Sequence, residues 1–283
     1  MSMDTHTGTR SGAASGWNVS AGLGRIQGLT LRYFYLYRSS VPRLLEQLYW
    51  PVVDLLVWGF VTIYLRQFEG ALPNFLAYFL GGLILWDMLF RSQVGVTVAY
   101  LEEVWSRNLL NLFVSPLRTG EFLTASIAIA VMRTVFAAFV TLMIAWLFYG
   151  FNAFIMGVWI WTFVGSLMLM GWAMGIFISG LIMRFGQGAE SLAWGLIFLI
   201  QPVAAVFYPV SVLPPALQHI SQFIPAAHVF EGMRQVLDGG GAPLHHLGWA
   251  YGLNAVYLSA ALWFFYHTLA EAKREGRLLR VGE

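Results

Sequence analysis

The sequence YLEEVWSRNLLNLFVSPLRTGEF, residues 100–122, contains the one long polar insert, residues 101–121, in a chain whose other long stretches are apolar. Because proline disfavours helix at the residue before it, Pro116 predicts that a helix in this insert ends near Ser115. Four apolar residues recur at helical spacing and are predicted to share one face: Leu101, Trp105, Leu109 and Leu112. The residues predicted to present the other, polar side are Glu103, Arg107, Leu110 and Asn111. That side either docks on a partner protein or belongs to a helix that merely lies on the membrane.

The composition on either side of the insert is that of a membrane protein. Of the 283 residues, 58% are hydrophobic and only 11% are charged, whereas soluble domains carry about 25% charged residues. A helix needs about 20 apolar residues to cross the hydrocarbon core, so the chain has room for six spans and none for a soluble catalytic domain. The predicted fold class is an all-α, polytopic integral membrane protein with six transmembrane helices: 49–65, 75–100, 122–148, 155–183, 191–208 and 246–269.

These spans are predicted to form a single transmembrane permease-like domain, residues 22–270. Residues 1–21 are rich in Ser, Gly and Thr and are predicted to be a disordered cytoplasmic tail, and residues 271–283 a basic cytoplasmic tail. Within the fourth span, Gly171 and Gly175 predict a close contact with another helix. The net charge of +2 is too small to indicate nucleic-acid binding, and the absence of cysteine excludes disulfide and thiolate chemistry.

Residues 22–48 precede the first span and mix arginines with aromatic and aliphatic residues. This pattern is typical of a helix that lies flat at the membrane interface. The alternative is an ordinary basic flank of the first span.

The distribution of basic residues predicts the orientation, because cytoplasmic segments carry an excess of Lys and Arg. With both termini inside, twelve of the sixteen basic residues lie inside: Arg10, Arg25, Arg32, Arg38, Arg43, Arg107, Arg118, Arg184, Lys273, Arg274, Arg277 and Arg280. Only Arg66 and Arg234 fall outside, while Arg91 and Arg133 lie within spans. The insert is therefore predicted to be cytoplasmic, and residues 209–244 to lie on the outer side.

Charged residues within the predicted spans are candidates for function, since they are costly in a membrane. Asp87 and Arg91 are spaced i, i+4 and can neutralise each other, and both are expected towards the cytoplasmic end of the second span. Arg133 either pairs with Asp87 or meets an anionic substrate headgroup. Asp54 is expected near the inner end of the first span. The Asp87–Arg91 pair is either structural or part of a proton-coupled transport mechanism.

The stretch 209–244 is semi-polar and rich in proline. It is predicted to form two short helices that fold back into the outer leaflet, because each apolar run is too short to span and starts beside a proline. The alternative is an exposed loop. Glu231 and Arg234 are three residues apart and can pair on the polar side. The predicted outer-gate residues are Pro209, Pro214, Pro215, Pro225, Glu231 and Arg234.

The order of these segments resembles the permease subunit of type 2 ABC exporters. The resemblance rests on the basic N-terminal segment, the two spans, the segment SPLRTGEF (residues 115–122) and the segment FYPVSVLPPALQHISQFIPAAHVFEGMRQVL (residues 207–237), and it covers nearly all of residues 25–270. It implies that residues 102–115 form a coupling helix that sits in a groove of a separate ATPase. It also implies that residues 212–223 and 227–237 are re-entrant helices that close the outer mouth.

The resemblance further implies an ATP-driven exporter in the bacterial plasma (inner) membrane, multi-pass and with both termini cytoplasmic. Members of that family carry drugs, lipid-linked polysaccharides or lipooligosaccharides, so an amphipathic, lipid-linked or glycan substrate is expected. Six spans are half of the usual pathway, which predicts a second copy of the chain as a homodimer partner, surrounded by membrane lipids. The only lysine, Lys273, has no phosphate-binding loop around it. The chain is therefore predicted not to be an enzyme and to bind no metal or cofactor; ATP and Mg bind to the partner ATPase.

Two other classes remain as alternatives. Glu102, Glu103 and Arg107 match the EExxxR motif of intramembrane CAAX-type proteases, but the partner motifs FxxxH and HxxxN are absent. A proton-coupled secondary transporter would use Asp87, Arg91 and Glu190 as a relay, but residues 49–148 and 155–269 show no convincing repeat.

Overall fold

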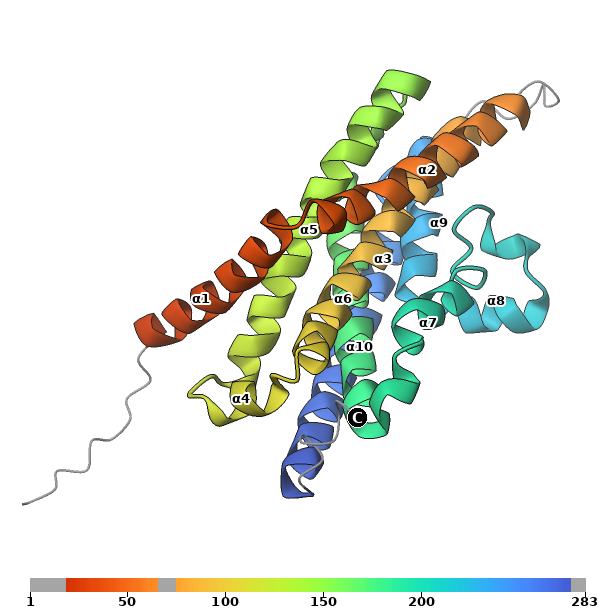
Figure 1. The fold of residues 1–283 in the computed structure, drawn as a ribbon. Helices are drawn as coiled ribbons and strands as arrows, with labels where there is room; N and C mark the ends of the chain where they lie inside the picture. Colours follow the sequence, from red (N-terminus) through yellow and green to blue (C-terminus); the bar gives the residue numbers. More distant parts are fainter. Residues whose placement is uncertain (1–18, 66–74, 276–283) are drawn as a thin grey trace, which may run out of the picture.

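The fold is that of a computed structural model, which describes residues 19–65 and 75–275. In this part of the chain every regular element is helical (Figure 1), which confirms the predicted all-α class. The α-helices are α1 (Val19–Arg38), α2 (Val41–Leu65), α3 (Phe75–Trp105), α4 (Leu109–Val114), α5 (Thr119–Tyr149), α6 (Trp159–Phe185), α7 (Leu192–Ile200), α8 (Pro215–Ser221), α9 (Pro225–Leu237) and α10 (Leu244–Arg274). Short 3-10 turns stand between some of them: η1 (Ala153–Met156), η2 (Gly186–Ala189) and η3 (Val210–Val212).

The ends of the domain differ slightly from the predicted ones. Residues 19–21, predicted to belong to the N-terminal tail, are the first residues of α1, and α10 continues past residue 270 to Arg274. The remainder of the two predicted tails lies outside the described residues.

The predicted spans correspond to helices of unequal length. Among the described residues, α5 and α6 are long and apolar enough to cross a membrane, and α2 has a shorter apolar segment, Leu48–Tyr64. The fifth predicted span, residues 191–208, is wrong as a continuous helix, because α7 has only 9 residues and rises about 14 Å. The regular helix ends just before Pro202, whose ring nitrogen cannot donate a hydrogen bond, and the chain turns at Ala205, which has a φ of 52°.

The basic N-terminal segment is interrupted at Ser39 and Ser40. α1 ends immediately before these residues, and α2 begins immediately after them at Val41 rather than at the predicted position 49. The helix of the first predicted span is therefore longer than expected, and its first turns carry the last part of the basic segment.

α1 runs beside α5 rather than lying across the end of the bundle. Arg25 of α1 contacts Glu121 of α5, and Tyr37 of α1 contacts Arg133 of α5. Both helices advance by 12 residues between these contacts, which is about 18 Å of helix. α1 is thus inclined along α5 (Figure 1), because these side-chain contacts hold it against the bundle. The flat position of this helix at the membrane interface stays a prediction.

The centre of the bundle is a tight contact between α3 and α6. A Cβ atom added to Gly171 would lie 2.7 Å from the Cβ of Ser92, and one added to Gly175 would lie 2.8 Å from the carbonyl oxygen of Gln93. Only glycine permits this approach, so the predicted close helix contact is confirmed. The buried amide of Gln93 also donates to the carbonyl oxygen of Ala193 at 3.1 Å, which ties the short α7 to α3.

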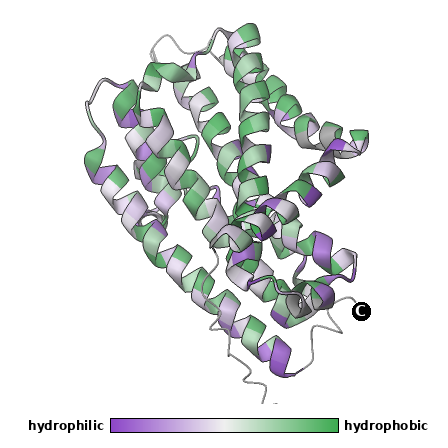
Figure 2. Ribbon diagram, turned by 90° about the vertical axis from the view of Figure 1, so that its left-hand side faces the viewer, coloured by the Kyte–Doolittle hydropathy of each residue, from purple (hydrophilic) through white to green (hydrophobic). Residues whose placement is uncertain are grey.

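The bundle has two ends, which we call the α4 end and the α8–α9 end. The start of α1, the start of α5 and the end of α10 lie at the α4 end, whereas α8, α9 and the start of α10 lie at the other (Figure 1). Hydrophobic residues cover most of the length of the long helices (Figure 2), including exposed aromatic side chains such as Trp146 and Trp161. This distribution matches a bundle whose sides face lipid.

Candidate functional site

The polar insert forms a turn and a short helix rather than one long helix. α3 continues to Trp105, Arg107 then adopts a left-handed φ of 53°, and α4 has only six residues. α4 ends at Val114, as the following Ser-Pro sequence predicts. The break redirects the chain, so Trp105 is 50% exposed, and the prediction that it shares the apolar face is wrong. The other three predicted apolar residues are buried: Leu101, Leu109 and Leu112.

Glu103 is the buried centre of this end of the molecule. Its side chain is fully buried, so the prediction that it faces away from the apolar side is wrong. Its carboxylate accepts hydrogen bonds from the Tyr33 hydroxyl at 2.8 Å and the Asn108 amide at 2.6 Å, and it forms an ion pair with Arg32 at 3.0 Å. Burial, together with the adjacent Glu103 carboxylate, raises the pKa of Tyr33, so the tyrosine stays protonated and acts as the donor. Glu103 thereby joins α1 to the turn between α3 and α4.

A second carboxylate, Glu102, extends the contact to α5. It accepts a hydrogen bond from the Tyr37 hydroxyl at 3.0 Å, and that hydroxyl accepts one from Arg133 at 2.8 Å. The Arg133 guanidinium also lies 4.2 Å from the centre of the Tyr37 ring, a cation–π distance. The predicted pairing of Arg133 with Asp87 is therefore not the arrangement found, because α1 offers Arg133 a nearer partner.

Glu121 fixes the start of α5. Its carboxylate accepts from the Arg118 backbone amide at 2.9 Å, which satisfies one of the free donors at a helix N-terminus. The same carboxylate binds Arg25 through two bonds of 2.6 and 2.8 Å. As a result, the two helices that flank α4, α3 and α5, are each held to α1 by carboxylates.

The exposed part of the α4 end is the turn and the outer side of α4. Arg107 and Asn111 are exposed, as expected for residues that meet a partner. The side chain of Leu110 lies outside the described residues. The structure therefore brings Arg107 and Asn111 to a common surface and places Glu103 beneath it.

A charged cavity of about 70 Å³ lies in the middle of the bundle, between α2, α3, α5 and α7. Asp87 and Arg91 form the predicted i, i+4 ion pair at 2.7 Å, and Asp54 lines the same cavity. All three residues stand near the midpoints of their helices. The structure therefore places them at mid-helix rather than at a helix end, and their depth in the membrane stays a prediction.

The positions of Glu190, Glu102 and Glu103 do not support the two alternative functions, a proton-coupled transporter and an intramembrane protease. Glu190 follows η2 at the end of α6 and is not among the residues that line the charged cavity, so the three-residue proton relay is not assembled. Both carboxylate oxygens of Glu103 and Oε1 of Glu102 bind side chains of the protein, which engages the pair in contacts within the protein.

The outer stretch forms two short helices, each with a proline in its first turn. α8 begins at Pro215 and α9 at Pro225, where the missing N–H costs no helical hydrogen bond. α9 is buried on most of its length, whereas α8 leaves Ile220 about half exposed. Pro209 stands immediately before η3, and Pro214 stands immediately before α8. The prediction of two short helices is confirmed, although α8, at seven residues, is shorter than expected.

Glu231 and Arg234 pair at 3.0 Å, but they do not form an exposed polar side. Arg234 is buried and donates to the carbonyl oxygen of Ala205 at 3.0 Å. Glu231 accepts from the backbone amide of Val210 at 2.7 Å. The pair thus holds the non-helical segment after α7 against α9, because that segment leaves backbone groups that helical hydrogen bonds do not satisfy.

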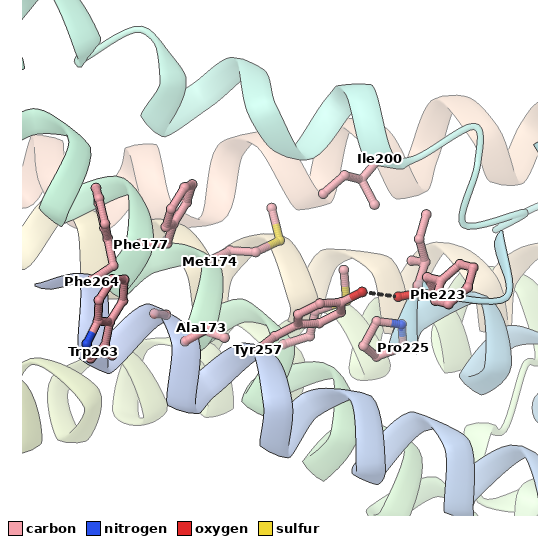
Figure 3. A pocket seen from close by; sticks show the side chains of 13 residues that line it. Ala173, Met174, Phe177, Ile200, Phe223, Pro225, Tyr257, Trp263 and Phe264 are labelled. Carbon is pink, nitrogen blue, oxygen red and sulfur yellow. Dashed lines mark hydrogen bonds between the residues drawn. The ribbon is translucent and has the colours of Figure 1, made fainter. Parts of the chain in front are cut away.

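A larger cavity, of about 490 Å³, lies between α6, α7, α10 and the junction of α8 with α9 (Figure 3). Its walls include Met174, Phe177 and Phe264, and no charged side chain is among the described residues that line it. The Tyr257 hydroxyl points along the cavity and donates to the carbonyl oxygen of Phe223 at 2.6 Å (Figure 3). This cavity can hold a hydrocarbon group but offers no charge to a ligand.

Sequence reasoning missed the two tyrosines of α1 and the place of Asp54. Tyr33 and Tyr37 stand four residues apart, which puts both on one side of a helix. Glu102 and Glu103 are adjacent acidic residues in an otherwise apolar part of the sequence. Those two patterns were the available signal. The meeting of Asp54 with Asp87 and Arg91 depends on how α2 packs on α3 and has no local signal.

The comparison with known families agrees with this geometry. The sequence profile described as ABC-2 type transporter matches residues 32–237, which extend from within α1 to the end of α9 and include the buried glutamates, the charged cavity and the Glu231–Arg234 pair. No curated protein matches the chain.

Proposed function

Because the chain belongs to the ABC-2 type transporter family as a membrane-spanning permease subunit, we propose that it is the permease of an ATP-driven exporter. The family works with a partner ATPase component. The observation that carries the proposal is the construction of the α4 end: an exposed turn and short helix stand on a base of buried carboxylate contacts. Such an element can receive a push from an ATPase without deforming.

The proposed coupling surface is formed by Arg107, Leu110 and Asn111. Glu103 acts beneath it as a positioning residue, since it binds α1 and Asn108 at once. Movement of α4 would then be passed to α1 through Glu103, and to α5 through the Glu102–Tyr37–Arg133 contacts. The α4 end is accordingly the cytoplasmic end, which agrees with the excess of basic residues there.

The proposed working unit contains two permeases and two ATPases in the bacterial inner membrane, with ATP and Mg bound by the ATPases. The homodimer is supported by the sequence, which predicts six spans, half of the usual number. The α8–α9 end is then the outer mouth, and the exported molecule is amphipathic, lipid-linked or glycan in nature.

The test is reconstitution. The chain is co-expressed with candidate ATPases, purified as a complex and placed in inverted membrane vesicles. We expect uptake into these vesicles that requires ATP hydrolysis and persists when the proton gradient is dissipated by an uncoupler. Uptake that follows the proton gradient without ATP would overturn the proposal.

A further inference from the structure

The charged cavity has a position that restricts what can occupy it. Asp54 is 13 residues from the start of α2, and Asp87 is 12 residues from the start of α3, which places both carboxylates about 18–20 Å along their helices. In the proposed permease this is the middle of the membrane. A carboxylate at that depth is costly unless it meets a cation, water or another protein.

The charges in the cavity do not cancel. Arg91 is bound to Asp87 through a 2.7 Å contact between Nε and Oδ2, and both side chains are largely buried. Asp54 is exposed, and no hydrogen bond or ion pair of its side chain is found within the described residues. The three groups therefore carry a formal charge of −1: the charge of Arg91 acts on both carboxylates, and of the two carboxylates Asp54 is the accessible one.

The remaining wall of the cavity is aromatic. Trp50, Trp86, Phe90 and Phe198 line it together with the charged residues. Aromatic faces attract cations, and more strongly in sites shielded from water. A negative group surrounded by aromatic rings recognises an organic cation better than an anion or a neutral polar molecule.

An apolar strip leads away from the cavity towards the α8–α9 end. Trp58 lies one turn beyond Asp54 on the same side of α2, and its ring lies 5.7 Å from that of Phe79 and 6.4 Å from that of Phe207. The rings of Phe79 and Phe207 are themselves stacked at 4.8 Å. Because the cavity of about 70 Å³ is small, it can admit a compact charged group, while a hydrocarbon tail lies along this strip.

We propose that this cavity binds the positively charged group of an amphipathic organic cation, with Asp54 as its counter-ion. The Asp87–Arg91 pair holds the floor of the cavity, and the tail of the ligand lies on Trp58, Phe79 and Phe207. The proposal rests on the proposed export function and names the substrate class for it: an alkylammonium-like amphiphile rather than a glycan or an acidic lipid.

The test uses the permease–ATPase complex in lipid nanodiscs, without ATP, and two probes with the same tail. Binding of octylammonium and of 1-octanol is measured by equilibrium dialysis, with empty nanodiscs subtracted. We expect octylammonium to bind at least about tenfold more tightly than octanol, and Asp54→Asn, which keeps the side-chain shape, to remove that preference. Asp54→Glu should retain part of it. Asp238→Asn, which alters an exposed carboxylate at the α8–α9 end, is the matched control and should bind as the unaltered protein does.

Equal binding of the two probes, or an unchanged preference in Asp54→Asn, would overturn the proposal. Equal binding would mean that Asp54 carries a proton or borders only lipid. The outcome is separate from that of the export function. A complex that transports with ATP but shows no charge preference refutes the cation site alone. A complex that binds octylammonium but shows no ATP-dependent uptake refutes the exporter and leaves the site in place.

Discussion

The α4 end and the α8–α9 end are both built from short helices, but they are held in different ways. At the α4 end, Glu102, Glu103 and Glu121 bind side chains from α1 and join α1 to α3, α4 and α5. At the α8–α9 end, the Glu231–Arg234 ion pair binds two backbone groups of a non-helical segment, and the Ser221 hydroxyl donates to a third, the carbonyl oxygen of Val203. The first arrangement transmits a displacement among several helices. The second can release one segment without disturbing the rest, as a gate requires.

The largest effect is expected from removing the base of the α4 end. Glu103→Ala leaves the buried Tyr33 hydroxyl without its acceptor and Arg32 without its ion-pair partner, and should cost about 3–5 kcal/mol. The thermal unfolding temperature of the purified permease should fall clearly. Glu102→Gln keeps an acceptor for Tyr37 and serves as the control, with little change. An equal, small effect of both variants would show that the buried carboxylate does not brace this end.

The exposed surface above that base should matter for the partner and not for the fold. Leu110→Asp places a charge where an apolar contact with the ATPase is proposed and should weaken that contact about 100-fold. Export and recovery of the ATPase with the permease should both be lost, while insertion and thermal stability of the permease stay as before. Full ATPase recovery with full export in this variant would exclude the docking surface.

A smaller effect is expected at the other end. Arg234→Met keeps a long apolar stem but removes the bonds to Ala205 and Glu231, which should cost about 1–3 kcal/mol. Hydrogen exchange of residues 205–212 should become faster, whereas that of α3 and α4 should not change. In the unaltered protein, α9 should exchange more slowly than α8, because α9 is buried and α8 is not. If hydrogen exchange became equally faster at the α4 end and at the α8–α9 end, the proposed difference between the two ends would be wrong.

The last prediction tests which way the two ends face rather than how strongly they are held. Single cysteines at Thr119 and Gly240 stand at the α4 end and beyond α9, and a third at Ser11 lies in the N-terminal tail. An impermeant thiol reagent applied to intact cells should label Gly240→Cys alone, and all three after lysis. Labelling of Thr119→Cys in intact cells would invert the orientation.

Several local features could be read directly from the residues. Gly171 and Gly175 predicted a close contact of α6 with another helix, because a missing side chain lets two helices approach closely at any site. Pro116, Pro215 and Pro225 predicted a helix end and two helix starts, because proline acts on its own backbone and the residue before it. The Asp87–Arg91 pair followed from helical spacing alone.

Other features could not be read this way. Glu103 was predicted to be exposed on the polar side of one straight helix. The left-handed backbone at Arg107 breaks that helix, so the predicted polar side does not form. The span 191–208 was predicted from its hydropathy, which does not register that Pro202 and Ala205 end the helix early. Arg133 was expected to meet either Asp87 or an anionic substrate headgroup, yet it donates to Tyr37 of α1, 96 residues away in sequence.

The sequence by itself determined that the chain is helical, apolar along most of its length, charged mainly on one predicted side, and ordered like an ABC-2 permease. These properties depend on composition, spacing and the backbone preferences of single residues, which act over a turn or two of helix. Only the tertiary structure decided that Glu103 is buried, that Asp54 shares a cavity with Asp87 and Arg91, and that Arg234 binds a backbone carbonyl. Each of these depends on which helices pack together, since burial and charge pairing are set by neighbours that are distant in sequence.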